Sequence, residues 1–209
     1  AYPISDLALE GNHRISVLYQ KEVTPKGTSF TIRKFKQDPY SVVDLISFGT
    51  ISVDVAAYLW MLMEAKMSIM VIGSTGSGKT TILNAITGLV NPDYKIFSVE
   101  DVAEINIKHE NWFSLVARTG FGPSGEGEIG LYDLIKSGVR HRPDYIVVGE
   151  IRGAEAYVMF QAMATGHGGL CTMHADSLES AGKRLQQKPM DIPASYLSLM
   201  NCAIVIRRV

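Results

Sequence analysis

The stretch Gly73-Ser-Thr-Gly-Ser-Gly78-Lys79-Thr80 decides the fold of this chain. It satisfies the pattern G-x-x-x-x-G-K-[ST], in which glycines let the backbone curl so that successive N–H groups point at one phosphate. A helix that begins directly after such a loop adds the positive end of its dipole. The lysine supplies a positive charge for the outer phosphates, and the threonine hydroxyl is a ligand for Mg²⁺. The sequence therefore predicts a phosphate-binding loop.

The residues on either side fit the strand–loop–helix context that the motif requires. Residues 67–72 form a short apolar run with β-branched members, and residues 79–87 continue as a helix with Gly88 as a stop signal. We therefore expect the loop to bind ATP, with Mg²⁺ coordinated by Thr80. The expected nucleotide-binding residues are Gly73, Ser74, Thr75, Gly76, Ser77, Gly78, Lys79, Thr80 and Thr81.

Strands and helices alternate from residue 67 onward, which predicts an α/β fold with a parallel or mostly parallel sheet. The strand candidates are continuous apolar runs, as expected for strands that are covered on both faces. They are residues 67–72, 95–99, 145–148, 169–173 and 202–206. The helix candidates are residues 79–87, 131–139, 155–164 and 178–187. The glycine-rich residues 119–128 are predicted to form a mobile loop.

Residues 1–36 are β-rich and are expected to be the C-terminal part of a separate N-terminal α/β domain. Strand candidates at 13–19 and 28–35 flank a Pro-Lys-Gly turn signal. Two or three strands alone bury little, so a larger domain is expected around them. The chain also begins and ends abruptly, and we expect it to be a fragment of a longer protein.

A linker is expected over residues 37–50, followed by a second domain over residues 51–209 that is truncated at its C-terminus. Within this region, Ser41 and Asp44 form a capping-box pattern that predicts the start of a short helix. Residues 52–66 predict a longer helix with apolar residues on most of its faces, so we expect it to be largely buried.

The composition excludes several classes of protein. With 209 residues and a hydrophobic content of 46%, the chain has ample material for a core. The net charge of −1 argues against a strongly basic surface for nucleic acid, although a neutral total leaves room for a local basic patch. Cys171 and Cys202 lie far apart in apolar runs and predict buried free thiols in a reducing compartment. No segment is predicted to span a membrane, because Glu64 and Lys66 interrupt the longest apolar region.

Polar side chains follow three of the predicted strands at the points where the strands end. Glu100 and Asp101 follow one strand, Glu150 and Arg152 another, and His174 the third. The carboxyl ends of parallel strands share one edge of the sheet with the phosphate loop, so these side chains are expected to converge there. Carboxylates that orient water or approach Mg²⁺, with a polar sensor of the γ-phosphate, predict hydrolysis of a nucleoside triphosphate. Glu150 and Glu100 are the two candidates for the general base.

One position departs from the usual second NTPase motif, which has Asp before its final Glu. Here that position is Gly149. Mg²⁺ must then rely on Thr80, phosphate oxygens and water, with Glu100 and Asp101 as candidates for a further contribution.

Each candidate also has an ordinary structural interpretation. Strand-end carboxylates are often only solvated, which applies to Glu100, Asp101 and Glu150. A histidine is often a satisfied core residue, which applies to His174, or lies in a glycine turn, which applies to His167. Arginines are often surface cations, which applies to Arg140, Arg142, Arg14 and Arg33.

Four motifs in the expected order resemble the secretion-system traffic ATPases, the family of type II/type IV secretion, pilus and archaellum motors. The phosphate loop is the first. Ser98-Val-Glu-Asp-Val-Ala-Glu104 resembles the family's acidic box. Residues 139–152 resemble its second NTPase motif, which also carries Gly before Glu. Residues 165–177 resemble its histidine box. The resemblance covers nearly the whole chain.

Finer details resemble the archaeal branch of this family. They are Ser29-Phe-Thr-Ile-Arg33-Lys-Phe35, Glu110-Asn-Trp112 and His174-Ala-Asp176. Bacterial members usually have Pro after Glu-Asp, where this chain has Val102, and bacterial secretion members often carry a four-cysteine zinc module that this chain lacks.

The resemblance implies a RecA-like P-loop NTPase core over residues 51–209, preceded by the β-rich remnant of the N-terminal domain. It implies a homo-oligomeric, hexameric ATPase in the cytoplasm. The ring would be peripheral at the inner face of the cell membrane, on a polytopic membrane platform protein, with no direct membrane insertion and no nucleic acid. Beside the catalytic residues Glu150, Glu100, Lys79 and His174, it implies coupling or sensor roles for His167, Asp101, Arg140, Arg152, Arg33 and Arg14. Arg14 and Arg33 would reach a nucleotide across a domain or subunit boundary.

Two other functions stay open from the sequence. A RecA-like motor that translocates nucleic acid would use the same core, although the mild acidity counts against it. A nucleotide-gated scaffold would bind ATP without hydrolysing it.

Overall fold

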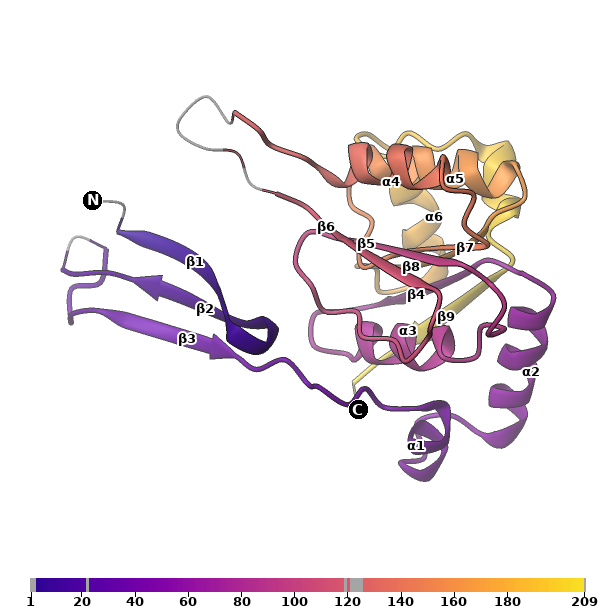
Figure 1. Ribbon diagram of the computed structural model, residues 1–209, viewed down its shortest axis with the longest axis horizontal. Helices are drawn as coiled ribbons and strands as arrows, with labels where there is room; N and C mark the ends of the chain where they lie inside the picture. Colours follow the sequence, from indigo (N-terminus) through magenta and orange to yellow (C-terminus); the bar gives the residue numbers. More distant parts are fainter. Residues whose placement is uncertain (1–2, 22, 119, 121–125, 209) are drawn as a thin grey trace. The chain divides into compact units, whose positions relative to one another are not determined.

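Figure 1 shows the computed structural model, which describes residues 3–21, 23–118, 120 and 126–208. The chain forms two compact units, residues 1–38 and 39–209. The first unit is an antiparallel sheet in the order β1-β2-β3. Its strands are β1 (Ile4–Leu9), β2 (His13–Leu18) and β3 (Ser29–Arg33), with the short 3-10 helix η1 (Glu10–Asn12) between the first two. Strands β2 and β3 confirm two predictions, whereas β1 was not predicted.

The second unit is built on a six-stranded sheet in the order β6-β5-β7-β8-β4-β9. All its strand pairs are parallel, which confirms the predicted fold class. The strands are β4 (Ile69–Gly73), β5 (Ile96–Glu100), β6 (Trp112–Val116), β7 (Tyr145–Val148), β8 (Gly168–Met173) and β9 (Cys202–Ile206). Only β6 was not predicted. It is an edge strand with exposed residues, so it lacks the continuous apolar run of its neighbours.

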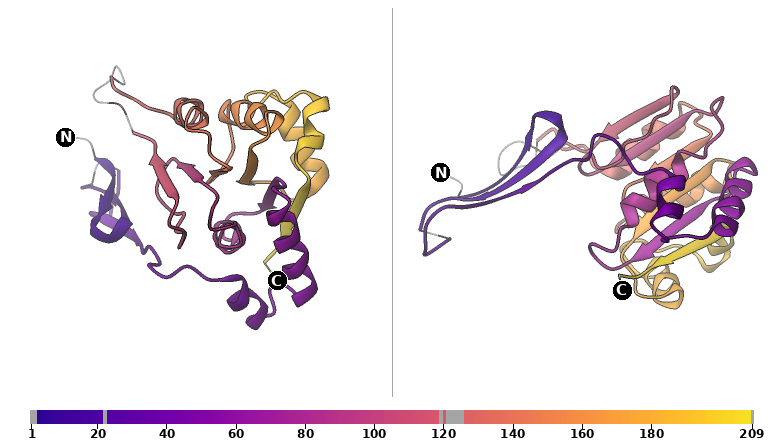
Figure 2. Two further views of the ribbon diagram at one scale, coloured as in Figure 1. Left: turned by 45° about the vertical axis from the view of Figure 1, so that its right-hand side comes forward. Right: turned by 90° about the horizontal axis from the view of Figure 1, so that it is seen from below.

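Helices cover both faces of this sheet, as Figures 1 and 2 show. One face carries α1 (Val42–Ser47), α2 (Val53–Glu64) and α3 (Lys79–Thr87). The other carries α4 (Leu131–Val139), α5 (Glu155–Ala164), α6 (Leu178–Gln186) and the 3-10 helix η2 (Ala194–Leu199). In the described part of the chain, no helix combines the length and the apolarity that a membrane span requires.

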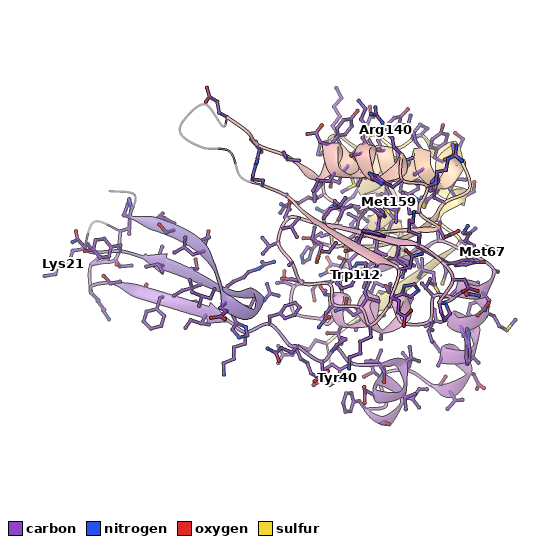
Figure 3. All side chains as sticks on the ribbon, in the orientation of Figure 1. Lys21, Tyr40, Met67, Trp112, Arg140 and Met159 are labelled. Carbon is purple, nitrogen blue, oxygen red and sulfur yellow. The ribbon has the colours of Figure 1, made fainter. Side chains whose placement is uncertain are left out.

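Most strands of this sheet are largely apolar because they lie between two hydrophobic cores, one on each face. In β4, Met70 and Ile72 pack into the core under α4–α6, whereas Ile69 and Val71 pack into the core under α1–α3. Because successive side chains of a strand point to opposite faces, both registers must be apolar. Met159 of α5 is fully buried and lies between the helices and the sheet in Figure 3.

The linker was predicted over residues 37–50, and residues 39–50 of it are grouped with the second unit. Ser41 and Asp44 form the expected capping box, in which each side chain accepts a hydrogen bond from the other residue's backbone N–H. Helix α1 then buries Val42 and Leu45 in the core beside α3.

The prediction that the second helix is largely buried was wrong. Only Ala56, Leu59 and Met63 of α2 are buried, because the helix packs against the core along one face. The exposed large apolar residues of this helix are Val53, Val55, Tyr58, Trp60 and Met61. Apolar residues on every side of a helix therefore do not by themselves indicate burial within one chain.

Two smaller expectations have mixed outcomes. Cys171 and Cys202 are free thiols, and burial raises the pKa of both, but only Cys171 is fully buried. Residues 119 and 121–125 of the predicted loop at 119–128 lie outside the described residues. At the base of that loop, Arg118 and Ile129 form an antiparallel bridge.

A glycine at the start of β8 has a packing role. An added Cβ at Gly168 would lie 2.5 Å from Cε1 of the Tyr145 ring. This ring is fully buried, and its hydroxyl donates to the carbonyl oxygens of Met63 and Met67. The ring therefore has no room to move away.

We expect Gly168→Ala to lower the free energy of unfolding by about 1–3 kcal/mol, the usual cost of overpacking a core. Gly182→Ala in α6 is the control, because an added Cβ there meets no atom within 4 Å. That variant should be more stable by about 0.5–1 kcal/mol. Urea unfolding of both variants makes the comparison, and an unchanged stability of the Gly168 variant would contradict the packing argument.

Candidate functional site

The loop between β4 and α3 has the backbone that the motif demands. Gly76 and Gly78 have φ angles of 72° and 97°, in the left-handed region that favours glycine. Gly73 is required for a different reason, since an added Cβ would lie 2.5 Å from the carbonyl oxygen of Ile206 and 2.6 Å from Oγ of Ser77. The loop therefore curls tightly between β9 and the start of α3. Its exposed turn consists of Ser74, Thr75 and Gly76, and Thr81 follows in the first turn of the helix.

The side chain of Lys79 is buried within this loop and bonds to its backbone. It is only 8% exposed, and its Nζ donates to the carbonyl oxygen of Ser74 at 3.0 Å. Burial lowers the pKa of the ammonium, and the charges of Glu150 and Glu104 partly offset this effect. Within the described residues, no carboxylate forms an ion pair with this ammonium. A buried cation without a direct counter-ion, beside exposed loop amides, fits the phosphates of a nucleotide.

His174 links Lys79 to Glu150. Its Nε2 lies 2.9 Å from Oε1 of Glu150, and its Nδ1 lies 3.3 Å from Nζ of Lys79. The imidazole thus lies between the ammonium, which contacts Nδ1, and the carboxylate, which Nε2 approaches at ion-pair distance. The structure thus brings together the ends of β7 and β8 and the first residue of α3, at the edge of the sheet where the sequence analysis expected them.

Glu100 is differently placed. Its side chain is buried, and Oε1 accepts hydrogen bonds from the backbone N–H groups of Glu104 at 2.9 Å and Ile105 at 2.8 Å. It lies directly against Gly149, where an added Cβ would be 3.0 Å from Cγ of Glu100. The glycine that stands in the usual aspartate position therefore provides the space that Glu100 occupies.

The loop that carries Glu150 is held in place by hydrogen bonds to Glu155, at the start of α5. The buried Glu155 carboxylate accepts hydrogen bonds from the backbone N–H groups of Arg152 and Gly153, both at 2.6 Å. Asp101 and Arg152 form an exposed ion pair above this loop. The backbone is thus fixed at the residues that follow Glu150, whose carboxylate contacts His174.

Three residues that the site prediction omitted contribute to this geometry. Glu104 accepts a hydrogen bond from Oγ1 of Thr80 at 3.3 Å, Arg184 donates to the carbonyl oxygen of His174, and Glu155 holds the loop described above. The acidic residue four positions after Glu100 was visible in the sequence. No comparable signal marks Arg184, because its role depends on how α6 packs.

The structure does not bring His167 and Arg140 to the phosphate loop. His167 precedes β8, so the length of this strand separates it from His174, about 20 Å in extended backbone. Its Nδ1 lies 3.0 Å from the carbonyl oxygen of Ala162, close to the hydroxyl of Thr165. Arg140, labelled over the helices in Figure 3, is the C-cap of α4. It precedes β7, so it lies toward the amino-terminal ends of the strands, away from the loop.

Arg14 and Arg33 belong to the first unit. They are direct partners in the antiparallel register of β2 and β3, which places two cationic residues side by side on that sheet.

Comparison with known proteins supports the interpretation of this site. Residues 9–207 match the protein family described as type II/IV secretion system protein. An uncharacterised protein of Methanocaldococcus jannaschii is 48% identical over 98% of this chain and 37% of its own length. The conjugal transfer protein TrbB of Rhizobium radiobacter is 34% identical over 85% of this chain and 53% of its own length. The chain thus spans about a third to a half of the length of these relatives.

Two solved structures share the fold. The VirB11 ATPase of the Brucella suis type IV secretion system, solved with sulphate, has a TM-score of 0.56 and 25% identity over 95% of this chain and 67% of its own. The pilus retraction motor PilT with bound ADP has a TM-score of 0.66 and 22% identity over 94% of this chain and 53% of its own. Together with the phosphate loop and the carboxylates around it, the family match establishes that this chain belongs to the type II/IV secretion ATPase family.

Proposed function

We propose that this chain is the ATP-hydrolysing part of a Mg²⁺-dependent motor that drives secretion or the assembly of a pilus or archaellum filament. The observation that carries the proposal is the buried ammonium of Lys79, held inside a glycine loop and joined through His174 to Glu150. A cation, an imidazole and a carboxylate around one phosphate-binding loop are the groups that phosphoryl transfer to water requires.

Each group has a distinct role in this proposal. The backbone amides from Ser74 to Thr80 and the ammonium of Lys79 hold the phosphates. Glu150 orients the attacking water, because its carboxylate is about one-third exposed and faces the loop. Glu100 is the weaker candidate for this role, since it is buried and its Oε1 already accepts two backbone hydrogen bonds. His174 contacts both Lys79 and Glu150 and would respond to the γ-phosphate.

Mg²⁺ fits beside Thr80, whose hydroxyl lies next to a carboxylate. When bound, the ion would neutralise charge on the phosphates. Asp101 and Arg152, joined by their ion pair, would transmit movement of the loop that follows Glu150. For His167 and Arg140, at the opposite edge of the sheet, the proposal is coupling to movement rather than contact with phosphate.

The finer parts of the proposal concern the whole protein. We propose a hexameric ring in the cytoplasm that docks on a polytopic membrane platform protein. Arg14 and Arg33 would then approach the nucleotide of a neighbouring domain or subunit. Support comes from the family match and from the paired placement of these arginines on one sheet.

The proposal is tested by measuring phosphate release from ATP by the chain, with Mg²⁺ and with EDTA. We expect steady Mg²⁺-dependent release that single-stranded DNA does not stimulate. Nucleotide binding without any release would favour a scaffold that only binds ATP. Strong stimulation by DNA, weakened steeply by salt, would favour a nucleic-acid motor instead.

A further inference from the structure

We propose that Thr172 of β8 is a positioning residue for hydrolysis, because its hydroxyl holds the backbone directly before Glu150. The inference rests on the proposed function, in which Glu150 orients the attacking water. Thr172 would not touch the nucleotide itself and would act only through the placement of the Glu150 carboxylate.

Thr172 carries a buried hydroxyl in a strand whose other side chains are apolar. Its neighbours Cys171 and Met173 pack into the core under α4–α6, so Thr172 points to the other face of the sheet, which α3 covers. Burying a hydroxyl without a hydrogen-bond partner costs free energy, whereas valine would occupy nearly the same space without that cost. Threonine at this position therefore indicates a specific partner for the hydroxyl.

The partner of this hydroxyl belongs to the segment that carries Glu150. Oγ1 of Thr172 donates to the carbonyl oxygen of Gly149 at 2.7 Å. The carbonyl oxygen of Thr172 in turn accepts a hydrogen bond from the N–H of Ile151 at 2.9 Å. One residue of β8 thus holds the backbone on both sides of Glu150. A substitution at position 172 leaves the second bond available and removes only the first.

The bond to Gly149 sets the direction in which Glu150 leaves the backbone. The carbonyl of Gly149 and the N–H of Glu150 belong to one rigid peptide plane, so a bond to that carbonyl fixes the rotation of the plane that ends at Cα of Glu150. Glycine is the most permissive residue, so Gly149 does not set this rotation by itself. The Thr172 hydroxyl supplies the restraint that the glycine lacks.

The placement of this carboxylate affects the rate because a general base must lie within hydrogen-bonding reach of the water. Oε1 of Glu150 lies 2.9 Å from Nε2 of His174, which comes two residues after Thr172 in the chain. The same strand end therefore holds Glu150 through its backbone and through its side chain. A misplacement of about 1 Å costs up to about 100-fold in rate.

The test compares Thr172→Val and Thr172→Ser in steady-state hydrolysis of ATP with Mg²⁺. We expect Thr172→Val, which removes the hydroxyl, to lower kcat about 10- to 100-fold. Thr172→Ser keeps the hydroxyl and should restore most of kcat. Affinity for a non-hydrolysable ATP analogue should stay near the unmodified value in both variants, because Lys79 and the loop amides are unchanged. Without nucleotide, amide hydrogen exchange over residues 149–153 should be faster in Thr172→Val.

Thr87→Val is the matched control. Thr87 is also fully buried, and its hydroxyl donates to the carbonyl oxygen of Leu83 at 2.6 Å, at the end of α3 that lies away from the phosphate loop. Thr87→Val removes the same kind of hydrogen bond, so it should lower the urea midpoint of unfolding about as much as Thr172→Val does. It should leave kcat unchanged.

A double variant shows whether Thr172 acts through Glu150. In a Glu150→Gln background, Thr172→Val should lower the remaining rate little further, because a positioning residue has no effect once the group that it positions is absent. A purely structural role would give the same fractional loss of rate in both backgrounds.

The outcomes separate the inference from the proposal beneath it. Unchanged kcat or unchanged amide exchange in Thr172→Val would overturn the inference alone. A loss of kcat matched by Thr87→Val, accompanied by an equal loss of affinity, or repeated in the Glu150→Gln background would also overturn it, because the hydroxyl would then be only structural. No phosphate release by the unmodified chain would overturn the inference and the proposed function together.

Discussion

Replacing Lys79 with alanine is expected to abolish measurable ATP binding. The ammonium lies inside the loop, bonded to the carbonyl oxygen of Ser74 and shielded from water. The ammonium and a bound phosphate would form a buried, hydrogen-bonded charge pair, and removing one member of such a pair costs about 2–5 kcal/mol, which corresponds to about a 30-fold to several-thousand-fold loss of affinity. Isothermal titration calorimetry with Mg²⁺ and a non-hydrolysable ATP analogue measures this loss.

The folded state without nucleotide should tolerate the change. Burial lowers the pKa of Lys79, so the charged form is held there at a cost, and its removal gives back part of that cost. Lys79→Met, which keeps most of the side-chain volume, should lose affinity to the same extent. Lys183→Met on the exposed face of α6 is the control for loss of a positive charge and should bind normally. Near-normal affinity in either Lys79 variant would show that the loop does not use this lysine for phosphate.

Replacing Glu150 with glutamine is expected to separate binding from turnover. The amide keeps the size of the side chain but cannot take a proton from water, and loss of a general base costs about 10²- to 10⁴-fold in rate. Affinity should stay the same or tighten, because a negative charge near the phosphates is removed. Phosphate release and nucleotide binding, measured on the same preparation, give the two halves of the result.

Glu100→Gln is the informative comparison for Glu150→Gln. Glu100 accepts hydrogen bonds from two backbone N–H groups, so its replacement should lower the stability of the segment after β5 and affect binding and rate together. If Glu150→Gln hydrolyses ATP at the parental rate while Glu100→Gln does not, the roles assigned to the two carboxylates must be exchanged.

Much of the fold was accessible from the sequence because the strands are covered on both faces. Their apolar runs predicted five of the six parallel strands of the second unit, and helical patterns and capping signals predicted α1 to α6, with small errors in the ends of these elements. The edge strand β6 and strand β1 were missed, since their exposed or polar residues interrupt that pattern. The burial of α2 was overestimated, because apolar composition does not show which face a helix packs.

The candidate site was predictable to the extent that it follows strand ends. Glu150 lies two residues after the end of β7 and His174 directly after β8, so topology alone brings them to the loop. The partners of these residues were not predictable. The contact of Thr80 with Glu104 depends on how the segment after β5 folds back over α3, a detail set by tertiary packing rather than by local sequence. The distance of His167 from the loop, by contrast, follows from the predicted parallel strand, because His167 precedes β8 and His174 follows it.

A crystal structure of the chain with Mg²⁺ and a non-hydrolysable ATP analogue shows whether the triphosphate lies in the loop between β4 and α3. We expect the β- and γ-phosphates within hydrogen-bonding distance of the amides of residues 74–80 and of Nζ of Lys79. We also expect the metal ion at Oγ1 of Thr80 and the carboxylate of Glu150 beside the γ-phosphate. A nucleotide bound elsewhere on the chain, or a bound nucleotide with the Glu150 and His174 side chains turned away from it, would rule out the proposed site.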